Sequence, residues 1–376
     1  IQTETAEKFT MITLLQQLIF FSFFQAILLL LVFAFSSKHR KKTNLYLIIL
    51  VIVLLIGLSG RIFHIVDLFG GSRRWVGLSE FAILLFGPTV YLFTRSLISN
   101  RQFSRVDLVH YLPALCYNLI VTFYYLLPPA PIINERVASG ELFRVVNILV
   151  GIGLVVNSTY YILSLQKFKT FRSTLHSELS YTVSLKFLQN FLITIGACLL
   201  TWLSIYLLSL FSIEGLEREL RAFVWTAIAM IILFITHFQM LSPQVMQYSS
   251  LISNGKYQQS KFSAKDLDHL KVELDTIMEE KKPYLNQKLL KAELAHLMGI
   301  SNPELARLLN ERIGMSFFEY VNYHRIQEFI RLSQADDAGG YTFFGLAQRA
   351  GFNSKATFNK SFKQIMGCTP SAYFRQ

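Results

Sequence analysis

The chain has 376 residues, of which 52% are hydrophobic and only 16% are charged, and its formal net charge is +12 at pH 7. Soluble globular domains have about 25% charged residues, so this composition excludes a protein that is soluble over its whole length. The 3 cysteines are too few and too scattered for a disulfide framework or a cysteine-rich metal cluster.

Apolar residues are concentrated in the first part of the chain. Between residues 1 and 241 the apolar runs are nearly continuous, whereas the sequence from Ser242 onward has the pattern of ordinary amphipathic helices. Seven apolar segments each approach the roughly 20 residues that a helix needs to cross a bilayer, which predicts a seven-helix transmembrane bundle over residues 1–241. The segments are Met11–Phe35, Leu45–Asp67, Val76–Ile98, Leu108–Leu127, Leu142–Leu165, Phe187–Phe211 and Ala222–Leu241.

The loops between these segments indicate an orientation. Because the number of spans is odd, the two ends of the bundle lie on opposite sides of the membrane. The loops after spans one, three and five carry ten lysines and arginines, against five in the loops after spans two, four and six. Basic loops favour the cytoplasmic side, so we expect the N-terminus outside and the residues after Leu241 in the cytoplasm.

Polar side chains within the apolar segments are candidates for sensing a signal, because burying them in hydrocarbon is costly. Arg61 and His64 lie toward the outer end of the second span, and Glu80 lies at a similar depth in the third. One interpretation is an ion pair between Arg61 and Glu80, beside a pocket open to the outside. A fixed structural pair, or side chains that reach the membrane surface, is the alternative and the commoner situation. Four asparagines are expected to hydrogen-bond between helices: Asn118, Asn147, Asn157 and Asn190.

Residues 242–263 are predicted to form a linker, because Ser242-Pro243 stops a helix and the polar stretch that follows has no clear periodicity. An amphipathic helix is expected from Ala264 to Lys282, with leucine or isoleucine at residues 267, 270, 274 and 277. This repeat is shorter than the three or so heptads of a lasting coiled coil. It therefore favours the first helix of a C-terminal domain over a dimer contact.

A helix-turn-helix pattern is clearest over about residues 342–366. It contains the run G-F-N-S-K-A-T-F-N-K-S-F-K from Gly351, and G-C-T-P follows at residues 367–370. Glycine suits a turn that needs a positive φ, and Ser354 is a good N-cap for the next helix. Phe358, Phe362 and Ile365 recur at helical spacing, so one face of that helix is predicted to be buried.

An earlier pattern of the same kind spans about residues 289–312. Its two halves are A-E-L-A-H-L-M-G-I-S at residues 292–301 and P-E-L-A-R-L-L-N at residues 303–310. A further helix then begins near Phe317, and we expect its aromatic side chains in the core. Residues 264–376 are thus predicted to be a soluble all-α domain with two tandem helix-turn-helix units.

The two units together resemble the DNA-binding domain of the arabinose-regulator (AraC/XylS) family of bacterial transcription factors. The run from Gly351 to Lys363, the closing G-C-T-P-S-A-Y-F and the first unit carry this resemblance, which covers about the last hundred residues. It implies two recognition helices in successive major grooves, about 34 Å apart on one face of the duplex. The helix from Phe317 to Leu332 would join the two units and set that separation.

Polar and basic side chains of the two recognition helices are the candidate DNA contacts. They are Asn302, Glu304, Arg307 and Asn310 in the first helix, and Ser354, Lys355, Thr357, Asn359, Lys360 and Lys363 in the second. The side chains at 355 and 359 suit base edges, and those at 360 and 363 suit phosphates. No Asp or Glu follows Gly339, as expected of a surface that tracks phosphates.

These features predict a membrane-bound one-component transcription regulator in the inner membrane of a bacterium. Its expected partners are double-stranded DNA, the lipid bilayer and an unidentified small-molecule or membrane signal, with RNA polymerase and a second copy of the chain as further candidates. We expect no enzymatic activity, cofactor or metal site, because no cluster of His, Asp or Glu has metal-ligand spacing. The alternative is an integral-membrane transporter or enzyme with an appended regulatory DNA-binding domain.

Overall fold

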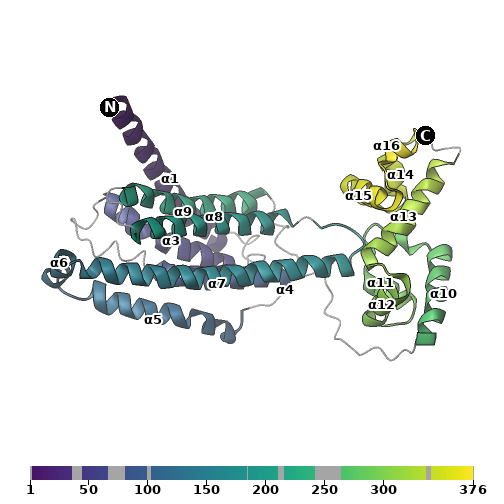
Figure 1. Ribbon diagram of the computed structural model, residues 1–376, viewed down its shortest axis with the longest axis horizontal. Helices are drawn as coiled ribbons and strands as arrows, with labels where there is room; N and C mark the ends of the chain where they lie inside the picture. The colour runs from purple at the N-terminus through teal and green to yellow at the C-terminus, as the bar shows by residue number, and fades with distance from the viewer. Residues whose placement is uncertain are drawn as a thin grey trace. The chain divides into compact units, whose positions relative to one another are not determined.

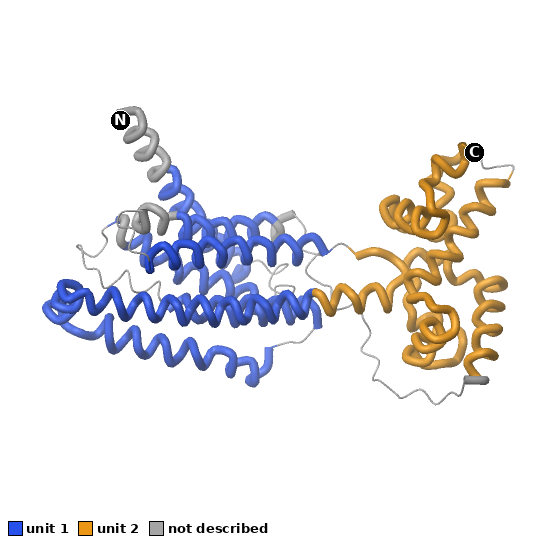
Figure 2. The backbone as a smooth tube through the Cα atoms, in the orientation of Figure 1, with its two compact units in different colours: residues 1–168, 185–249 blue, residues 169–184, 250–376 orange. Residues whose placement is uncertain are grey.

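The computed structural model describes residues 2–35, 45–66, 81–99, 103–183, 185–210, 216–241, 264–335 and 340–375. These residues form helices and turns with no named strand among them, which confirms the all-α class. They divide into an N-terminal unit of residues 1–168 and 185–249 and a C-terminal unit of residues 169–184 and 250–376 (Figures 1 and 2). The basic loop predicted at Ser36–Thr43 and the linker predicted over residues 242–263 lie outside the described residues.

Helices occupy the positions of all seven predicted spans in the N-terminal unit. They are α1 (Gln2–Phe35), α3 (Leu45–Val66), α4 (Ile83–Ser99), α5 (Leu112–Val121), α7 (Glu141–Glu178), α8 (Lys186–Leu210) and α9 (Leu216–Leu241). The 3-10 helix η2 (Arg105–Tyr111) leads into α5, and the π-helix η3 (Thr122–Leu126) follows it. The short helix α6 (Ala130–Ala138) lies in the loop before α7.

Five of these stretches are long and apolar enough to cross a membrane: Leu14–Phe35, Leu45–Phe63, Arg105–Leu126, Glu141–Glu178 and Lys186–Leu210. Two others, α4 and the Phe223–His237 part of α9, are shorter apolar helices. The first residues of the predicted third span, 76–80, lie outside the described part of the chain. The total of seven spans therefore stays a prediction.

The helix α7 is longer than the fifth span predicted from hydropathy. The apolar sequence ends near Leu165, but the helix continues through polar and basic residues to Glu178. No glycine or proline occurs between Gly153 and Glu178, so no helix breaker interrupts this stretch. Residues of α7 up to 168 belong to the N-terminal unit and those from 169 to the C-terminal unit, so the helix carries both colours in Figure 2.

Helices of the N-terminal unit pack closely at small residues. The helix α1 packs on α3 and α9, α8 packs on α9, and α3 packs on α4. Gly151 of α7 lies against the ring of Tyr206 on α8, where an added Cβ would come within 2.5 Å of the tyrosine Oη. Asn157 Nδ2 of α7 donates to the carbonyl of Ile83 on α4 at 2.8 Å, which confirms the interhelical hydrogen bond predicted for this asparagine.

The C-terminal unit contains two pairs of helices joined by one long helix. The first helix pair is α11 (Lys291–Leu297) and α12 (Asn302–Leu308), and the second is α14 (Phe343–Arg349) and α15 (Lys355–Met366). The connecting helix is α13 (Phe317–Ser333). Four shorter or flanking elements complete the unit: α10 (Ala264–Glu280), η6 (Pro283–Leu285), η7 (Leu309–Ile313) and α16 (Pro370–Tyr373).

Each helix pair has its own hydrophobic cluster, and α13 contributes to both. The first cluster contains Phe317 and Tyr320 of α13 and all four apolar positions predicted on α10, so α10 packs on the first pair as expected. The second contains Phe329 of α13 together with Phe358 and Phe362 of α15. Phe317, Tyr320 and Phe329 are core residues, as the sequence predicts, whereas Tyr323 of the same helix is exposed.

Candidate nucleic-acid interface

The second helix pair has the local structure that its sequence predicts. Gly351 has a φ of 97° in the turn before α15, a left-handed conformation that favours glycine. Ser354 is the N-cap of α15, and its Oγ accepts a hydrogen bond from the backbone N–H of Thr357 at 3.1 Å. Phe358 and Phe362 are buried, which fixes the face of α15 that points away from the core.

An exposed basic stripe runs along that outer face of α15. Lys355, Asn359 and Lys363 follow one another at intervals of one helical turn, Lys360 lies beside them, and all four side chains are exposed. In the described part of the chain none of these lysines pairs with a carboxylate, and residues 340–375 contain no Asp or Glu. Uncompensated positive charge of this kind attracts phosphate groups.

Polar side chains of the first helix pair make more hydrogen bonds within the protein than the exposed side chains of α15 do. Glu304 accepts hydrogen bonds from the backbone N–H and the Oγ of Ser301, each at 2.8 Å, and so closes the N-terminal cap of α12. Arg307 Nε donates to Glu311 one turn further along at 3.0 Å. Asn310, by contrast, is exposed.

A buried arginine of α13 ties the C-terminal unit together. Arg325 is 1% exposed, and its guanidinium group donates five hydrogen bonds to oxygen atoms. Two go to the carbonyls of Tyr284 and Asn286, at 2.8 and 2.7 Å. Two more go to the carbonyl and the Oγ of Ser180, at 2.6 and 3.0 Å. Burial lowers the pKa of Arg325 to about 9, which still leaves the group charged at neutral pH.

Ser180 belongs to what we call the bridging segment, residues 176–182, which includes the end of α7. Its backbone is anchored just before the first helix pair. Leu179 forms an isolated antiparallel bridge with Leu290, and the Ser180 Oγ donates to the carbonyl of Leu289 at 2.8 Å. Both Leu179 and Ser180 are fully buried. The bridging segment is therefore part of the folded C-terminal unit, although more than 100 residues separate it from Leu289 in the sequence.

Side chains of the bridging segment reach both helices that the sequence predicts to read DNA. Glu178 accepts hydrogen bonds from Lys291 Nζ at 2.5 Å and from Asn302 Nδ2, at the start of α12, at 3.3 Å. The hydroxyl groups of Thr182 and Thr357, in the first turn of α15, lie 2.6 Å apart. Thr357 is consequently only 4% exposed. Sequence patterns do not reveal this segment, because its contacts join residues far apart along the chain.

The AraC-type helix-turn-helix family matches residues 294–376. The matched region begins in α11 and includes the whole second helix pair. The match supports a DNA-binding domain of a transcription regulator, and we call this part of the C-terminal unit the AraC-type domain. Comparisons with curated proteins and with solved structures give no match.

The sensor residues predicted outside the AraC-type domain are only partly described. Glu80 lies outside the described residues, and only the backbone is described for His64. Arg61 is half-buried on α3, and its Nε is buried without a hydrogen bond to a described residue. The pair of Arg61 and Glu80 stays a prediction.

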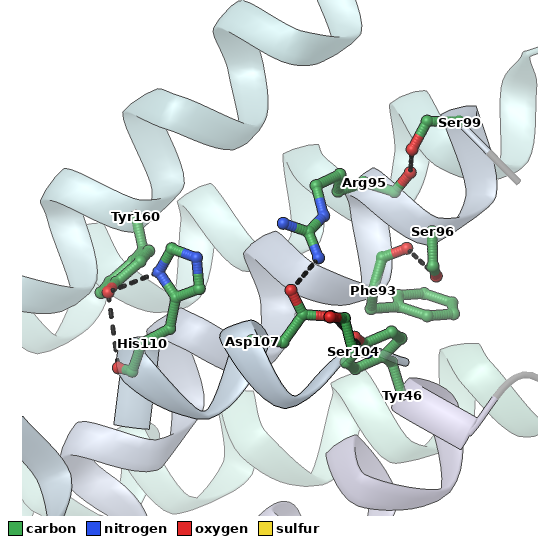
Figure 3. A network of polar contacts seen from close by, with 9 residues as sticks. All are labelled: Tyr46, Phe93, Arg95, Ser96, Ser99, Ser104, Asp107, His110 and Tyr160. Carbon is green, nitrogen blue, oxygen red and sulfur yellow. Dashed lines mark hydrogen bonds and ion pairs between the residues drawn. The ribbon is translucent and has the colours of Figure 1, made fainter. Parts of the chain in front are cut away.

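A different ion pair, not singled out in the sequence, lies within the N-terminal unit (Figure 3). Arg95 Nη2 of α4 donates to Asp107 Oδ1 of η2 at 2.5 Å. Tyr46 of α3 and the backbone N–H of Ser104 donate to the other carboxylate oxygen. Such partners are what a buried charge requires, and here they join three elements. An arginine near the end of one apolar segment and an aspartate just before the next is the signal that identifies such a pair.

Proposed function

We propose that the protein is a membrane-bound one-component transcription regulator that binds double-stranded DNA through α12 and α15. The match to AraC-type domains supports DNA binding. The uncompensated basic stripe supports α15 as the main contact surface. In this proposal Lys355 and Asn359 contact base edges, and Lys360 and Lys363 contact phosphates.

The first helix pair supplies fewer contacts in this proposal. Arg307 and Asn310 are its DNA-contacting side chains. Glu304 acts as the cap of α12, because its hydrogen bonds to Ser301 hold it at the start of that helix. Ser354 likewise acts as the N-cap of α15. The structure engages Asn302 and Thr357 with the bridging segment, so we assign them to positioning.

The N-terminal unit is proposed to lie in the inner membrane of a bacterium, with the AraC-type domain in the cytoplasm. Five helices long and apolar enough to span a bilayer support this placement. The excess of lysine and arginine in the loops after spans one, three and five supports the orientation.

The bridging segment is the observation that supports control by a signal at the membrane. It lies at the end of α7, whose earlier residues form the fifth predicted span, and it contacts both α12 and α15. Two recognition helices read one face of a duplex only when they are about 34 Å apart. A signal that shifts α7 would therefore change DNA affinity by changing how α12 and α15 are placed.

Operator binding by the full chain in lipid nanodiscs tests this route. The operator fragment is first isolated by chromatin pull-down with the wild-type protein. The double variant Glu178→Gln/Thr182→Val removes the side-chain contacts of the bridging segment with α12 and α15, and we expect it to bind the operator at least fivefold more weakly. The control Thr170→Val changes an exposed side chain on the same helix and should bind as the wild type does. Equal affinity of the double variant and the wild type would contradict control through this segment.

The membrane orientation has a separate test that uses the small number of cysteines. The variant Cys116→Ala/Cys198→Ala keeps Cys368, in the AraC-type domain, as the remaining thiol. We expect a membrane-impermeant maleimide to label Cys368 only after spheroplasts are permeabilised. A cysteine placed by Ser139→Cys in a cysteine-free chain, at the exposed turn between α6 and α7, should be labelled in intact spheroplasts. Labelling of Cys368 in intact spheroplasts would contradict the orientation.

A further inference from the structure

The N-terminal unit has a partly open cavity of about 480 Å³ between its helices. Six helices line it: α3, α4, α6, α7, α8 and α9. The lining is almost entirely aliphatic and aromatic, and it includes Trp202 of α8 and Trp225 of α9. No charged side chain is among the described residues that line it. Well-packed protein interiors have few voids larger than a water molecule, so a cavity of this size is a candidate binding site.

The size and lining of the cavity are those of a small-molecule site. Such sites have volumes of about 300–1,000 Å³ and combine an apolar, aromatic wall with a small number of polar groups. An apolar wall without cations disfavours a carboxylate or a phosphate, because the buried negative charge would have no partner. These properties select a neutral, lipophilic ligand.

Two polar side chains in the wall have no hydrogen-bond partner among the described residues. The amide of Asn147 on α7 and the hydroxyl of Tyr206 on α8 make no hydrogen bond within the described part of the chain. The Tyr206 hydroxyl lies against Gly151, which is one helical turn beyond Asn147 on α7. The two groups are therefore neighbours on one wall. Ser209, which also lines the cavity, already donates to the carbonyl of Tyr206 at 2.7 Å.

We propose that this cavity binds a neutral lipophilic molecule with a hydroxyl or carbonyl group, which hydrogen-bonds to Asn147 and Tyr206. The proposal rests on the proposed function, because it names the chemical class of the signal. The helix α7 connects the two: it lines the cavity with residues 142–150 and ends in the bridging segment. Filling the cavity changes how α7 packs on α8, and the bridging segment at the end of the same helix contacts α12 and α15.

Photolabelling of the full chain in phosphatidylcholine nanodiscs tests the site. The probe is a ten-carbon primary alcohol that carries a diazirine and a terminal alkyne. We expect labelled peptides from α7 and α8 that contain Val146 or Trp202, and we expect unlabelled decanol, but not decanoate, to reduce the labelling at least fivefold. The other outcomes overturn the proposal: labelling that decanol does not reduce, labelling reduced equally by decanoate, or a cavity labelled only by a diazirine on a phospholipid acyl chain.

A matched pair of variants separates the cavity from the lipid-facing surface. Val146→Trp fills the cavity from α7 and should lower decanol-sensitive labelling at least fivefold. Ile148→Trp adds the same ring to an outward position of α7 that is 61% exposed, and it should leave the labelling unchanged. Asn147→Leu keeps the side-chain volume similar and removes the amide, so it should weaken competition by decanol while competition by decane stays the same. Equal labelling of the Val146→Trp and Ile148→Trp proteins would overturn the cavity as the site.

Operator binding distinguishes a failure of the ligand site from a failure of the proposed function. We expect saturating decanol to change the operator affinity of the wild type at least threefold and to leave that of the Val146→Trp protein unchanged. An operator affinity that decanol does not change would overturn the cavity as the signal site. Absence of operator binding by the wild type in every condition would instead overturn the proposed function.

Discussion

The two helix pairs of the AraC-type domain share a topology but differ in how their charges are used. In the first pair, Arg307 bonds to Glu311, and in η7, which follows this pair, Arg312 Nε lies 3.1 Å from Asp268 Oδ1 of α10. In the second pair, Lys355, Lys360 and Lys363 are exposed and have no carboxylate beside them among the described residues. The second pair therefore presents net positive charge to solvent, and the first presents charges that are already compensated.

This difference indicates a division of labour between the pairs. Attraction to phosphates depends on cations that are free to displace counterions, and these belong to α15. The side chains of α12 gain less from DNA because binding would have to replace contacts that they already make within the protein. We infer that α15 supplies most of the affinity and that α12 fixes the register of the domain on the duplex.

Loss of Arg325 should have the largest effect, because its buried hydrogen bonds hold α13, the helix that joins the two pairs, to Ser180, Tyr284 and Asn286. Arg325→Met leaves the carbonyls of Ser180, Tyr284 and Asn286 buried without their donor, and we expect a loss of about 3–5 kcal/mol in unfolding free energy. Hydrogen exchange of the full chain in nanodiscs measures it, through the amides of α11 and α15. Gln327→Met, at an exposed position of the same helix, is the control. A loss of protection confined to one pair would show that the pairs are held independently.

The asymmetry between the pairs can be tested directly on the DNA contacts. Lys355→Ala and Arg307→Ala are each expected to weaken specific operator binding, by about 1–3 kcal/mol if the lost contact is to a base. The comparison predicts the larger loss for Lys355→Ala, because Arg307 bonds to Glu311 without DNA. Operator titrations with the full chain measure both.

The salt dependence of DNA binding is a second way to distinguish the two helix pairs. In a plot of the logarithm of the DNA-binding constant against the logarithm of the salt concentration, Lys360→Ala should reduce the steepness of the slope by about 1, because one phosphate contact is lost. Arg312→Ala, in η7 next to the first pair, should leave this salt dependence nearly unchanged. Equal slopes for the two variants would contradict the inference that α15 supplies most of the affinity.

The contact of Thr182 with Thr357 should couple the bridging segment to α15 by a smaller amount. A double-mutant cycle of Thr182→Val and Thr357→Val in the full chain should give an interaction energy of about 1 kcal/mol in unfolding free energy, the usual contribution of one hydrogen bond. The same cycle between Thr182→Val and Asn302→Ala should give none, since these two side chains form no hydrogen bond with each other in the described structure. Additive losses in the first cycle would argue against a specific contact.

The smallest effect is expected from pH, through Glu328 of α13. Hydrogen bonds from Arg331 hold the pKa of Glu328 below its usual value of 4.5. A carboxyl whose folded-state pKa is lowered contributes stability above the unfolded-state value and loses it as the pH falls toward the folded-state value. The AraC-type domain should therefore lose stability below about pH 4.5, and Glu328→Gln should make the stability curve flatter there. Thermal unfolding of the full chain between pH 3 and 6 measures this difference.

Local features of the AraC-type domain could be predicted from the sequence, and contacts between distant segments could not. The turn at Gly351, the cap at Ser354 and the buried faces of α10 and α15 each depend on residues a few positions apart, so spacing and residue type reveal them. Hydropathy reveals the apolar helices of the N-terminal unit, but it ends the fifth predicted span where the apolar residues end. It gives no sign that α7 continues to Glu178.

The candidate site shows the same limit. Exposed Lys355, Asn359 and Lys360 lie where the helical pattern places them, whereas Asn302 and Thr357 are engaged by residues 178 and 182. No periodicity predicts that an arginine on α13 donates to Ser180, 145 positions earlier. Such pairings depend on how the whole unit folds.

The discontinuity of the C-terminal unit has a consequence for biosynthesis. Residues 169–184 leave the ribosome well before residues 250–376, and the hydrophobic helices α8 and α9 are synthesised in between. Residues 169–184 must therefore wait for the rest of the unit until both of these helices have been synthesised. A protease that cut after α9 would release a fragment in which Arg325 has lost the oxygen atoms of Ser180. Cleavage would then yield an incompletely folded fragment in place of a liberated transcription factor.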